Sequence, residues 1–495
     1  MTQDALLDAL QDYEASHAVE NYTVDGWHVW PFLKMALRLG WLPREARPSW
    51  RSRLQYLFKA TWPGRVALGL SRLPGRLRRS AESRAPAAAG PVDALLLTLA
   101  ERRVSREGKS YEIYTDPFVA ALTDLGLSCR VWEQGCAGVA QHFPSTRVDL
   151  ALNREAGQRG LFSPVPGAPH WFAEMQGLLL TCVGRTVPWH ELYWLLESCL
   201  QRSRVFEGWL RRLAPRVLFV VCWYDPIVMA AVMAARRCGI RTVEIQHGLQ
   251  GRRHAGYSGW LRGPTGGYEV LPDAFWCWGN DAAAELRQFN PGFPAELRVL
   301  AGGNLWLNEW KKQLPQRRQA RQAAGAGRRL LVTLQREVPP LLLDLLKGSP
   351  AMWTWVIRFH PSRQPAERQS DQALLLATGH PGIVFDDGQL LYAQLLECDC
   401  HLTEASSVAL EALFFEVPTL ILGDSPLGRL GWKSYENYIA RGWMFGTADA
   451  AEGLAYLQRQ DGTGLATGGE GYFAGPDVAR GLLQELFARP RALEA

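Results

Sequence analysis

Two histidines and two arginines lie among glycines in the sequence QHGLQGRRHAGYSGW, residues 246–260. His247 and His254 are candidates for acid/base catalysis or for contact with a phosphate, because imidazole titrates near neutral pH. The glycines allow a ligand or another backbone to approach closely. Three more residues of the segment are candidates for binding a sugar acceptor: Gln246, Gly248 and Tyr257.

Two aspartates are candidates for a catalytic carboxylate near these histidines. Asp225 closes an apolar run in CWYDP, and Asp116 stands at the head of an expected helix in SYEIYTDP. Capping of the helix that follows explains each of them as well, since aspartate is a preferred N-cap residue. Both interpretations stay open for Asp225, whereas capping is favoured for Asp116.

The segment RFHPS, residues 358–362, offers cationic and hydrogen-bonding groups at the end of an expected strand. Arg358 and His360 alternate with a phenylalanine and therefore share one face, where both could donate to a phosphate or carboxylate. Pro361 fixes the backbone directly after them. Taken alone, this segment is explained better by an ordinary surface histidine at His360.

The segment TEASSVALEAL, residues 403–413, places two serines where a helix is expected to begin. The hydroxyl groups of Ser406 and Ser407, with the free amides of a first helical turn, could hold a phosphate, although a simple helix cap is favoured when this segment is taken alone. Glu411 falls about one turn later and could accept hydrogen bonds from ribose hydroxyl groups. Two further residues at strand ends complete the candidate donor site: Glu404 and Gly303.

The strands expected to position these groups are short apolar runs that alternate with helical segments. This alternation predicts βαβ units in a doubly wound parallel sheet, where ligands bind outside the carboxyl ends of the strands. The expected strands are VDALLLTLA, VLFVVCW and TVEIQH in the first series, and ELRVLAGGN, RLLVTLQ, WTWVIRFHP, GIVFDD, CHLTEA and PTLILG in the second.

The length of 495 residues predicts two domains with extensions. We expect a helical and basic segment at residues 1–90, a Rossmann-like acceptor domain at 91–295, a Rossmann-like nucleotide-sugar domain at 296–470 and a terminal helix at 471–495. One polar cluster in each half, facing across a cleft, is the arrangement of a two-domain nucleotide-sugar transferase.

The composition favours a reduced, cytoplasmic protein. Nine scattered cysteines show neither a disulfide framework nor zinc-ligand spacing. The amino terminus lacks the basic and apolar regions of a signal peptide, and no apolar run is long enough to cross a membrane. We expect no metal and no cofactor other than the nucleotide-sugar donor.

A basic segment at residues 44–84 carries eleven Lys or Arg against two Glu, interleaved with aromatic residues. This pattern suits the anionic inner face of a cell membrane, where each cation contributes roughly 1 kcal/mol. A solvated linker is the other interpretation. Nucleic acid is not expected as a partner, because no recognition motif accompanies the charge.

The order QHG, then HP, then SSVALEALFFEVPTLIL resembles bacterial GT-B glycosyltransferases that build capsule, lipopolysaccharide O-antigen and related surface polymers. The resemblance spans most of residues 20–425. It implies that His360 with Pro361, and Ser406 with Ser407, contact nucleotide phosphates, as in GT-B enzymes that use CMP-linked acidic sugars. In the β-Kdo transferase branch an amino-half carboxylate is the nucleophile, a role that would fall to Asp225.

The acidic-acidic-glycine motif of sialyltransferases of this fold matches only Asp386-Asp387-Gly388, in the carboxyl half rather than the amino half. We therefore expect a glycosyltransferase with a CMP-Kdo or related CMP-acid donor, acting on a surface polysaccharide or a lipid-linked glycan. The alternatives are a CDP-polyol phosphotransferase of the teichoic-acid kind and a non-catalytic GT-B protein that binds polymer or scaffolds an assembly.

Overall fold

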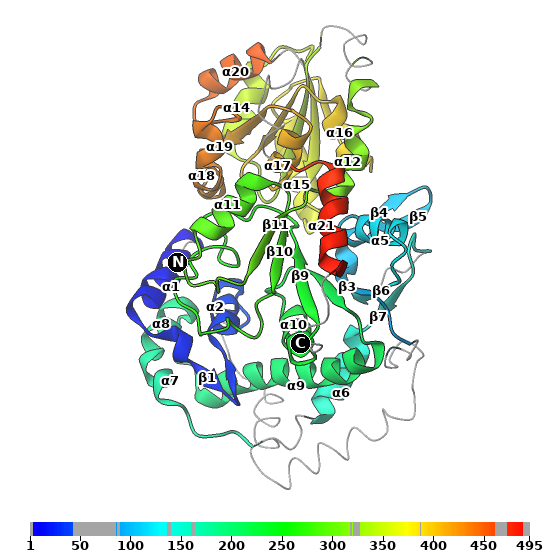
Figure 1. Cartoon of the computed structure of the whole chain (residues 1–495). Helices are drawn as coiled ribbons and strands as arrows, with labels where there is room; N and C mark the ends of the chain where they lie inside the picture. Colours follow the sequence, from blue (N-terminus) through cyan, green and yellow to red (C-terminus); the bar gives the residue numbers. More distant parts are fainter. Residues whose placement is uncertain are drawn as a thin grey trace.

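The computed structural model describes residues 3–42, 86, 90–135, 140–159, 164–316, 319, 327–386, 388–460 and 473–488. The chain forms two α/β halves, with the amino half below and the carboxyl half above in Figure 1. The basic segment 44–84 lies outside the described residues. Among the residues that are described, no helix is both long and apolar enough to cross a membrane.

The amino half is built on a parallel sheet whose strands, in spatial order and within the described ranges, are β11 (Arg298–Ala301), β10 (Ala274–Cys277), β9 (Arg241–Ile245), β8 (Val217–Val221), β3 (Ala94–Leu99), β6 (Cys129–Gln134) and β7 (Ser145–Arg147). The sequence order runs outward from β3 to β7 on one side and from β8 to β11 on the other. The direction of winding therefore reverses between β3 and β8, which is the switch point of a doubly wound sheet.

The carboxyl half repeats this topology in a second parallel sheet, whose strands across the described residues are β14 (Ile383–Phe385), β13 (Thr354–Phe359), β12 (Arg329–Leu334), β15 (Cys400–Thr403), β16 (Thr419–Leu422) and β17 (Met444–Thr447). Its switch point lies between β12 and β15. Two small antiparallel hairpins accompany the sheets: β1 (Thr23–Val24) with β2 (Trp27–His28), and β4 (Arg103–Arg106) with β5 (Lys109–Glu112).

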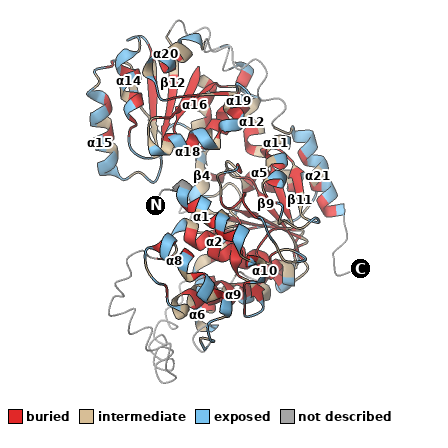
Figure 2. Cartoon of the chain, turned by 90° about the vertical axis from the view of Figure 1, so that its left-hand side faces the viewer, coloured by how far each residue is buried: buried red, intermediate tan, exposed pale blue. Residues whose placement is uncertain are grey.

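Helices cover both faces of each sheet, so the buried strands lie at the centre of each half in Figure 2. In the amino half the described helices are α1 (Gln3–Ser16), α2 (Trp30–Leu39), α5 (Thr115–Asp124), α6 (Asp149–Arg159), α7 (His170–Glu174), α8 (Gln176–Val183), α9 (Trp189–Leu213), α10 (Pro226–Arg237) and α11 (Asn280–Gln288). In the carboxyl half they are α12 (Leu305–Lys311), α14 (Pro340–Gly348), α15 (Pro365–Leu376), α16 (Leu391–Glu397), α17 (Val408–Phe414), α18 (Pro426–Ser434), α19 (Glu436–Ala440) and α20 (Ala450–Arg459).

Strand β8 shows why the apolar runs become central strands. Leu218 and Val220 pack into the hydrophobic cluster that contains α9 and α10. Phe219, one residue out of phase, packs on the other face with α5 and with the last helix, α21 (Pro476–Ala488). A strand buried on both faces needs a continuous apolar sequence, since successive side chains point to opposite sides. The predicted architecture of two Rossmann-like domains in tandem, called GT-B, is confirmed.

Helix α21 returns from the carboxyl half to the amino half, where it lies beside the amino-half sheet in Figure 1. Leu483 and Leu486 are buried against that sheet. Arg241 Nη1 donates to the carbonyl oxygen of Leu486 at 2.6 Å, and Arg298 pairs with Glu485 at 3.0 Å. The amino half is therefore completed by the end of the chain.

Helices α1 and α2 belong to the core of the amino half, because their apolar side chains share one hydrophobic cluster with α9 and α10. A buried ion pair joins them to residues 259–261. Lys34 Nζ lies 2.7 Å from Glu14 Oε2 and donates to the Gly259 carbonyl oxygen at 2.6 Å. Glu14 Oε1 accepts from the Leu261 amide at 2.8 Å. The amino-terminal helices thus hold the end of the histidine-containing segment.

Candidate functional site

The histidine-containing segment begins at the carboxyl end of β9, where hydrogen bonds made by the Gln246 side chain hold its first residues. Gln246 is fully buried, and its Oε1 accepts from the Trp278 amide at 2.6 Å while its Nε2 donates to the Gly248 carbonyl oxygen at 2.8 Å. Both polar ends of this amide are therefore used by the protein. The contacts give Gln246 a role in shaping the loop.

A chain of hydrogen bonds links the two predicted histidines through Tyr224, which follows β8. The Tyr224 hydroxyl lies 3.1 Å from His247 Nε2 and 3.3 Å from His254 Nε2. The Gly256 amide donates to His254 Nδ1 at 3.2 Å. Because Nδ1 is an acceptor in the neutral ring, Nε2 of His254 carries the proton and donates to Tyr224, whose hydroxyl can donate onward to His247.

A buried carboxyl group stands behind His247. Glu244 Oε1 accepts from the Tyr257 hydroxyl at 2.5 Å and lies 3.7 Å from His247 Nδ1. The Tyr257 hydroxyl is itself 3.4 Å from the same Nδ1. Burial raises the pKa of Glu244 to about 8, against the opposing hydrogen bond from Tyr257. At neutral pH this carboxyl is therefore mostly protonated.

Both histidines are held in the neutral form at neutral pH. Burial, with the charge of Arg102 and the neighbouring His254, sets the pKa of His247 well below its ordinary value. Burial and the charge of Arg38 lower the pKa of His254 to about 4. A neutral imidazole has one free nitrogen lone pair and can accept a proton, which is the requirement for a general base.

The loop after β3, on the other side of the switch point, brings Arg102 and Tyr114 to the same place. The Arg102 guanidinium lies 5.4 Å from the centre of the Tyr114 ring, and the Tyr114 hydroxyl donates to the His247 carbonyl oxygen at 2.8 Å. Glu112 accepts from the Tyr114 amide at 3.0 Å. A cation and an aromatic ring therefore adjoin the histidines at the switch point.

Asp225 binds backbone amides at the start of a helix, as capping predicts, whereas Asp116 lies in the first turn of α5, binds the amide of the last residue of β5 and does not cap the helix. Asp225 Oδ1 accepts from the Ile227 amide at 2.9 Å, from the Val228 amide at 3.2 Å and from Gln134 Nε2 at 3.0 Å, so it is the N-cap of α10. Asp116 Oδ2 accepts from the Glu112 amide at 3.0 Å, and burial raises the pKa of Asp116 to about 7. No hydrogen bond within the described chain joins either aspartate to His247.

The carboxyl half meets the histidine-containing segment at Ser407. A Cβ built on Gly248 would lie 3.5 Å from Ser407 Cβ, so this glycine allows the two halves to approach closely. Ser407 is the N-cap residue of α17, yet its side chain makes no capping hydrogen bond. Ser406, by contrast, accepts from the Val408 amide at 3.3 Å and is buried. The free hydroxyl on this face belongs to Ser407.

Glu411 lies behind these serines, buried among tyrosines from both halves. Tyr114 of the amino half and Tyr435 of the carboxyl half both interact with it electrostatically. Its Oε2 has no hydrogen-bond partner within the described residues. Burial raises the pKa of Glu411 to about 8. This carboxyl therefore holds a proton in the folded protein at neutral pH.

Replacing Glu411 with glutamine is expected to flatten the pH dependence of stability between about pH 6.5 and 8. A carboxyl with a raised pKa binds a proton in the folded state that the unfolded state releases, so stability falls as pH rises towards the folded pKa. The lowered pKa of His254 acts in the opposite direction, but only below about pH 6.5. Urea unfolding at several pH values would measure how the free energy of unfolding changes with pH. In the variant this slope should correspond to about one fewer proton released on unfolding.

A matched control is Glu155→Gln, a half-buried carboxylate on α6. The free energy of unfolding of this variant should change with pH as that of the wild-type protein does. A Glu411→Gln slope equal to that of the wild type would mean that Glu411 is ionised in the fold.

Arg358, His360 and Pro361, at the end of β13, are the next donor-site candidates, and Arg358 interacts electrostatically with the same tyrosine, Tyr392, as Glu411 does. Arg358 pairs with Asp386 at 2.9 Å and donates to the Gln389 carbonyl oxygen at 2.8 Å. His360 is exposed, and its Nδ1 lies 2.7 Å from the hydroxyl of Ser362, while Pro361 is exposed beside it. These residues follow β13, one strand away from β12 and the switch point.

Glu404 and Gly303 are both in contact with other parts of the protein. Glu404 Oε1 accepts from the Ser425 hydroxyl, and burial raises the pKa of Glu404. Gly303 has a φ of 85°, and a Cβ there would lie 2.4 Å from the Ala474 carbonyl oxygen. A glycine is required at this position because the backbone that leads to α21 leaves no room for a side chain.

The structure adds Glu244, Tyr224, Arg102 and Tyr114 to the residues found from the sequence. A signal for Glu244 was present, because it is the one acidic residue in the buried strand RTVEI. Tyr224 and Arg102 carry no comparable signal, since each is an ordinary residue in a short loop. Among the described residues, no group of three or more metal-ligating side chains is placed to hold a metal ion.

No protein-family model matches the sequence, and no curated protein matches it. Among solved structures, the UDP-GlcNAc 2-epimerase of Neisseria meningitidis bound to UDP-GlcNAc is 15% identical with a TM-score of 0.47, covering 80% of this chain and 100% of that one. The UDP-GlcNAc 2-epimerase of Methanocaldococcus jannaschii is 14% identical with a TM-score of 0.48 and the same coverage. MurG of Acinetobacter baumannii is 10% identical with a TM-score of 0.40, again covering 80% of this chain and 100% of that one. Likenesses this remote carry no argument about what the chain binds or does.

Proposed function

We propose that this protein is a glycosyltransferase that takes a sugar from a nucleotide-activated donor. One observation carries the proposal: the switch points of the two sheets, where doubly wound folds bind ligands, bring a polar cluster from each half into contact. The amino-half cluster contains His247 and Arg102, and the carboxyl-half cluster contains Ser407 and Glu411. Proton-handling and phosphate-binding groups on opposite sides of one contact are what sugar transfer requires.

In this proposal His247 is the general base that removes the proton from the acceptor hydroxyl. Glu244 Oε1 lies 3.7 Å from Nδ1, so this buried and mostly protonated carboxyl group packs behind the imidazole and limits its movement. Tyr224 connects His247 to His254 and holds the two rings in fixed orientations. Arg102 supplies positive charge for the leaving phosphate. Asp225 as a nucleophile stays a second proposal, since its carboxylate lies on the same loop as Tyr224.

For the donor we propose a CMP-linked acidic sugar such as CMP-Kdo, and for the acceptor a growing surface polysaccharide or a lipid-linked glycan of the capsule or O-antigen kind. The support is the sequence resemblance and the order of the QHG, HP and SS motifs. We further propose metal-independent transfer, and peripheral attachment to the inner face of the membrane through residues 44–84. A CDP-polyol phosphotransferase and a non-catalytic binding protein are the competing functions.

A thermal-shift screen with CMP, CDP, UDP, GDP and their sugar conjugates tests the proposal. A specific ligand at about a hundred times its Kd should stabilise the fold by about 2.7 kcal/mol. A response to CMP compounds supports the acidic-sugar donor, and a response to UDP or GDP compounds keeps the transferase and discards Kdo. A response to CDP-glycerol alone selects the phosphotransferase. No response to any nucleotide would overturn the proposal.

The variant Ser407→Ala is expected to weaken nucleotide binding by about 1–3 kcal/mol without lowering stability, because its hydroxyl caps nothing. Ser406→Ala should in addition destabilise the fold, since its hydroxyl holds the Val408 amide. The control is Ser349→Ala, directly after α14, whose hydroxyl contacts Leu346 and Trp355. Equal affinities for Ser407→Ala and Ser349→Ala would remove Ser407 from the donor site.

A further inference from the structure

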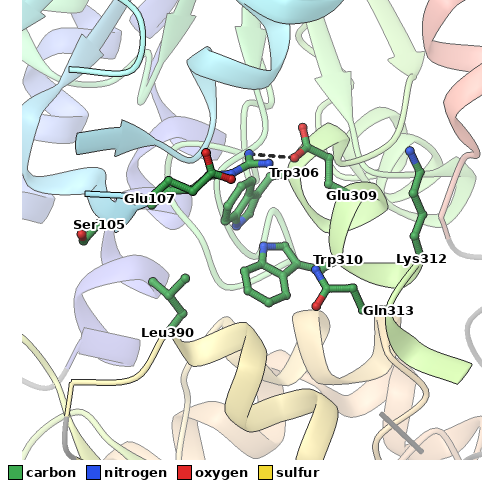
Figure 3. Close-up of a pocket in the computed structure, with 9 residues that line it drawn as sticks. Ser105, Glu107, Trp306, Glu309, Trp310, Lys312, Gln313 and Leu390 are labelled. Carbon is green, nitrogen blue, oxygen red and sulfur yellow. Dashed lines mark hydrogen bonds and ion pairs between the residues drawn. The ribbon is translucent and has the colours of Figure 1, made fainter. Parts of the chain in front are cut away.

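A pocket of about 560 Å³ lies beside the β4–β5 hairpin and helix α12, within the roughly 300–1,000 Å³ of typical ligand sites. Its floor and walls contain two indole rings, and Figure 3 shows Trp306 and Trp310 at its centre with Glu309 above them. The hairpin contributes Ser105, Arg106 and Glu107; α12 and the turn after it contribute Trp306, Glu309, Trp310, Lys312 and Gln313; Leu390 closes one side.

The pocket wall is ordered before any ligand arrives. The Arg106 guanidinium lies 4.8 Å from the Tyr111 ring centre and 5.4 Å from that of Trp306, and it donates to Glu309 at 2.8 Å. The Trp306 and Trp310 rings are 5.7 Å apart and nearly perpendicular, at 77°. Rings and charges held by one another lose little conformational freedom on binding, which favours affinity.

The charges of the lining indicate the class of ligand. Two cations, Arg106 and Lys312, are balanced by two carboxylates, Glu107 and Glu309. A balanced lining gives no net attraction to a phosphate or a carboxylate, whereas it offers both donors and acceptors to hydroxyl groups. Indole faces pack against the apolar faces of sugar rings in the same way that aromatic rings pack in protein cores.

We propose that this pocket binds an uncharged oligosaccharide, with Trp310 as the ring on which a sugar stacks. The site is separate from the candidate transfer site, because its lining includes none of the histidines or serines discussed above. Binding here requires no nucleotide and no reaction. An enzyme that also holds an uncharged part of its acceptor glycan at this pocket would keep the acceptor close between successive reactions.

The test is a glycan array that spans neutral and acidic oligosaccharides, probed with the full-length protein and with Trp310→Ala. We expect neutral glycans to bind the wild type. Their affinity for Trp310→Ala should be at least about tenfold lower, because the variant lacks the ring on which the sugar stacks. The matched control is Trp194→Ala, a half-buried tryptophan on α9, which should bind like the wild type. Glu309→Gln, which keeps the side-chain shape but breaks the pair with Arg106, gives a second test if Trp310→Ala does not fold.

Three results would overturn the proposal. The first is equal binding by the wild type and Trp310→Ala, or by the wild type and Glu309→Gln where that variant stands in. The second is binding restricted to acidic glycans, and the third is no binding to any glycan. Because the array contains no nucleotide donor, these results are independent of the nucleotide screen for the proposed transferase.

Discussion

Replacing Lys34 with methionine is expected to lower the free energy of unfolding by about 3–5 kcal/mol. Lys34 and Glu14 are both fully buried, and removal of the cation leaves a carboxylate inside the protein with its charge uncompensated. The same substitution removes the hydrogen bond to Gly259, so the end of the histidine-containing segment loses one of its attachments. Chemical denaturation followed by circular dichroism would measure the loss.

Two further variants separate the ion pair from general effects of substitution. The double variant Lys34→Met with Glu14→Gln should recover much of the lost stability, because no buried charge remains. Lys347→Met removes a cation from an exposed pair on α14 and should change the free energy by less than about 0.5 kcal/mol. A Lys34→Met protein as stable as Lys347→Met would show that the buried pair contributes nothing.

Replacing His247 with glutamine is expected to lower kcat by about 10²–10⁴-fold, the range for loss of a general base. Nucleotide affinity should be unchanged, because the donor is proposed to bind on the carboxyl-half side at Ser407. His254→Ala and Tyr224→Phe should each have a smaller effect, since both act through the same link to His247. Steady-state transfer from the nucleotide sugar found in the thermal-shift screen is the measurement.

The double variant of His254 and Tyr224 should be no slower than the more damaging single variant, since the two residues belong to one chain of hydrogen bonds. Asp225→Asn tests the competing nucleophile, because asparagine also caps helices well. If Asp225→Asn abolishes transfer while the His247 variant stays active, the base proposal fails and the nucleophile proposal replaces it.

The fold followed closely from the sequence because both sheets are buried on two faces. Runs such as VLFVV in β8 must be apolar at every position, which makes them stand out among amphipathic helices. Helix ends were harder to place. Helix α17 was expected to begin at Ser406 but begins at Val408, because the Ser406 side chain folds back onto the Val408 amide.

The site was predicted only in part, and the reason is physical. Residues with unusual chemistry in a loop, such as His247 and His254, can be found from composition and position. Their partner Tyr224 follows β8 and is recognised only when the strand order places β8 beside β9, the strand that carries Glu244 and leads into His247. Arg102 is even further from the histidines in the sequence, and the pairing of β3 with β8 brings it to the site.

Helix α21 has a consequence for the synthesis of the protein. The apolar face of the amino-half sheet around Phe219 is covered by residues as late as Phe487. At about 5–20 residues per second, the ribosome needs roughly ten to thirty-five seconds to make the carboxyl half before α21 emerges. During that interval the amino half presents an uncovered apolar surface, which is the kind of surface that chaperones recognise and that leads to aggregation when they are absent.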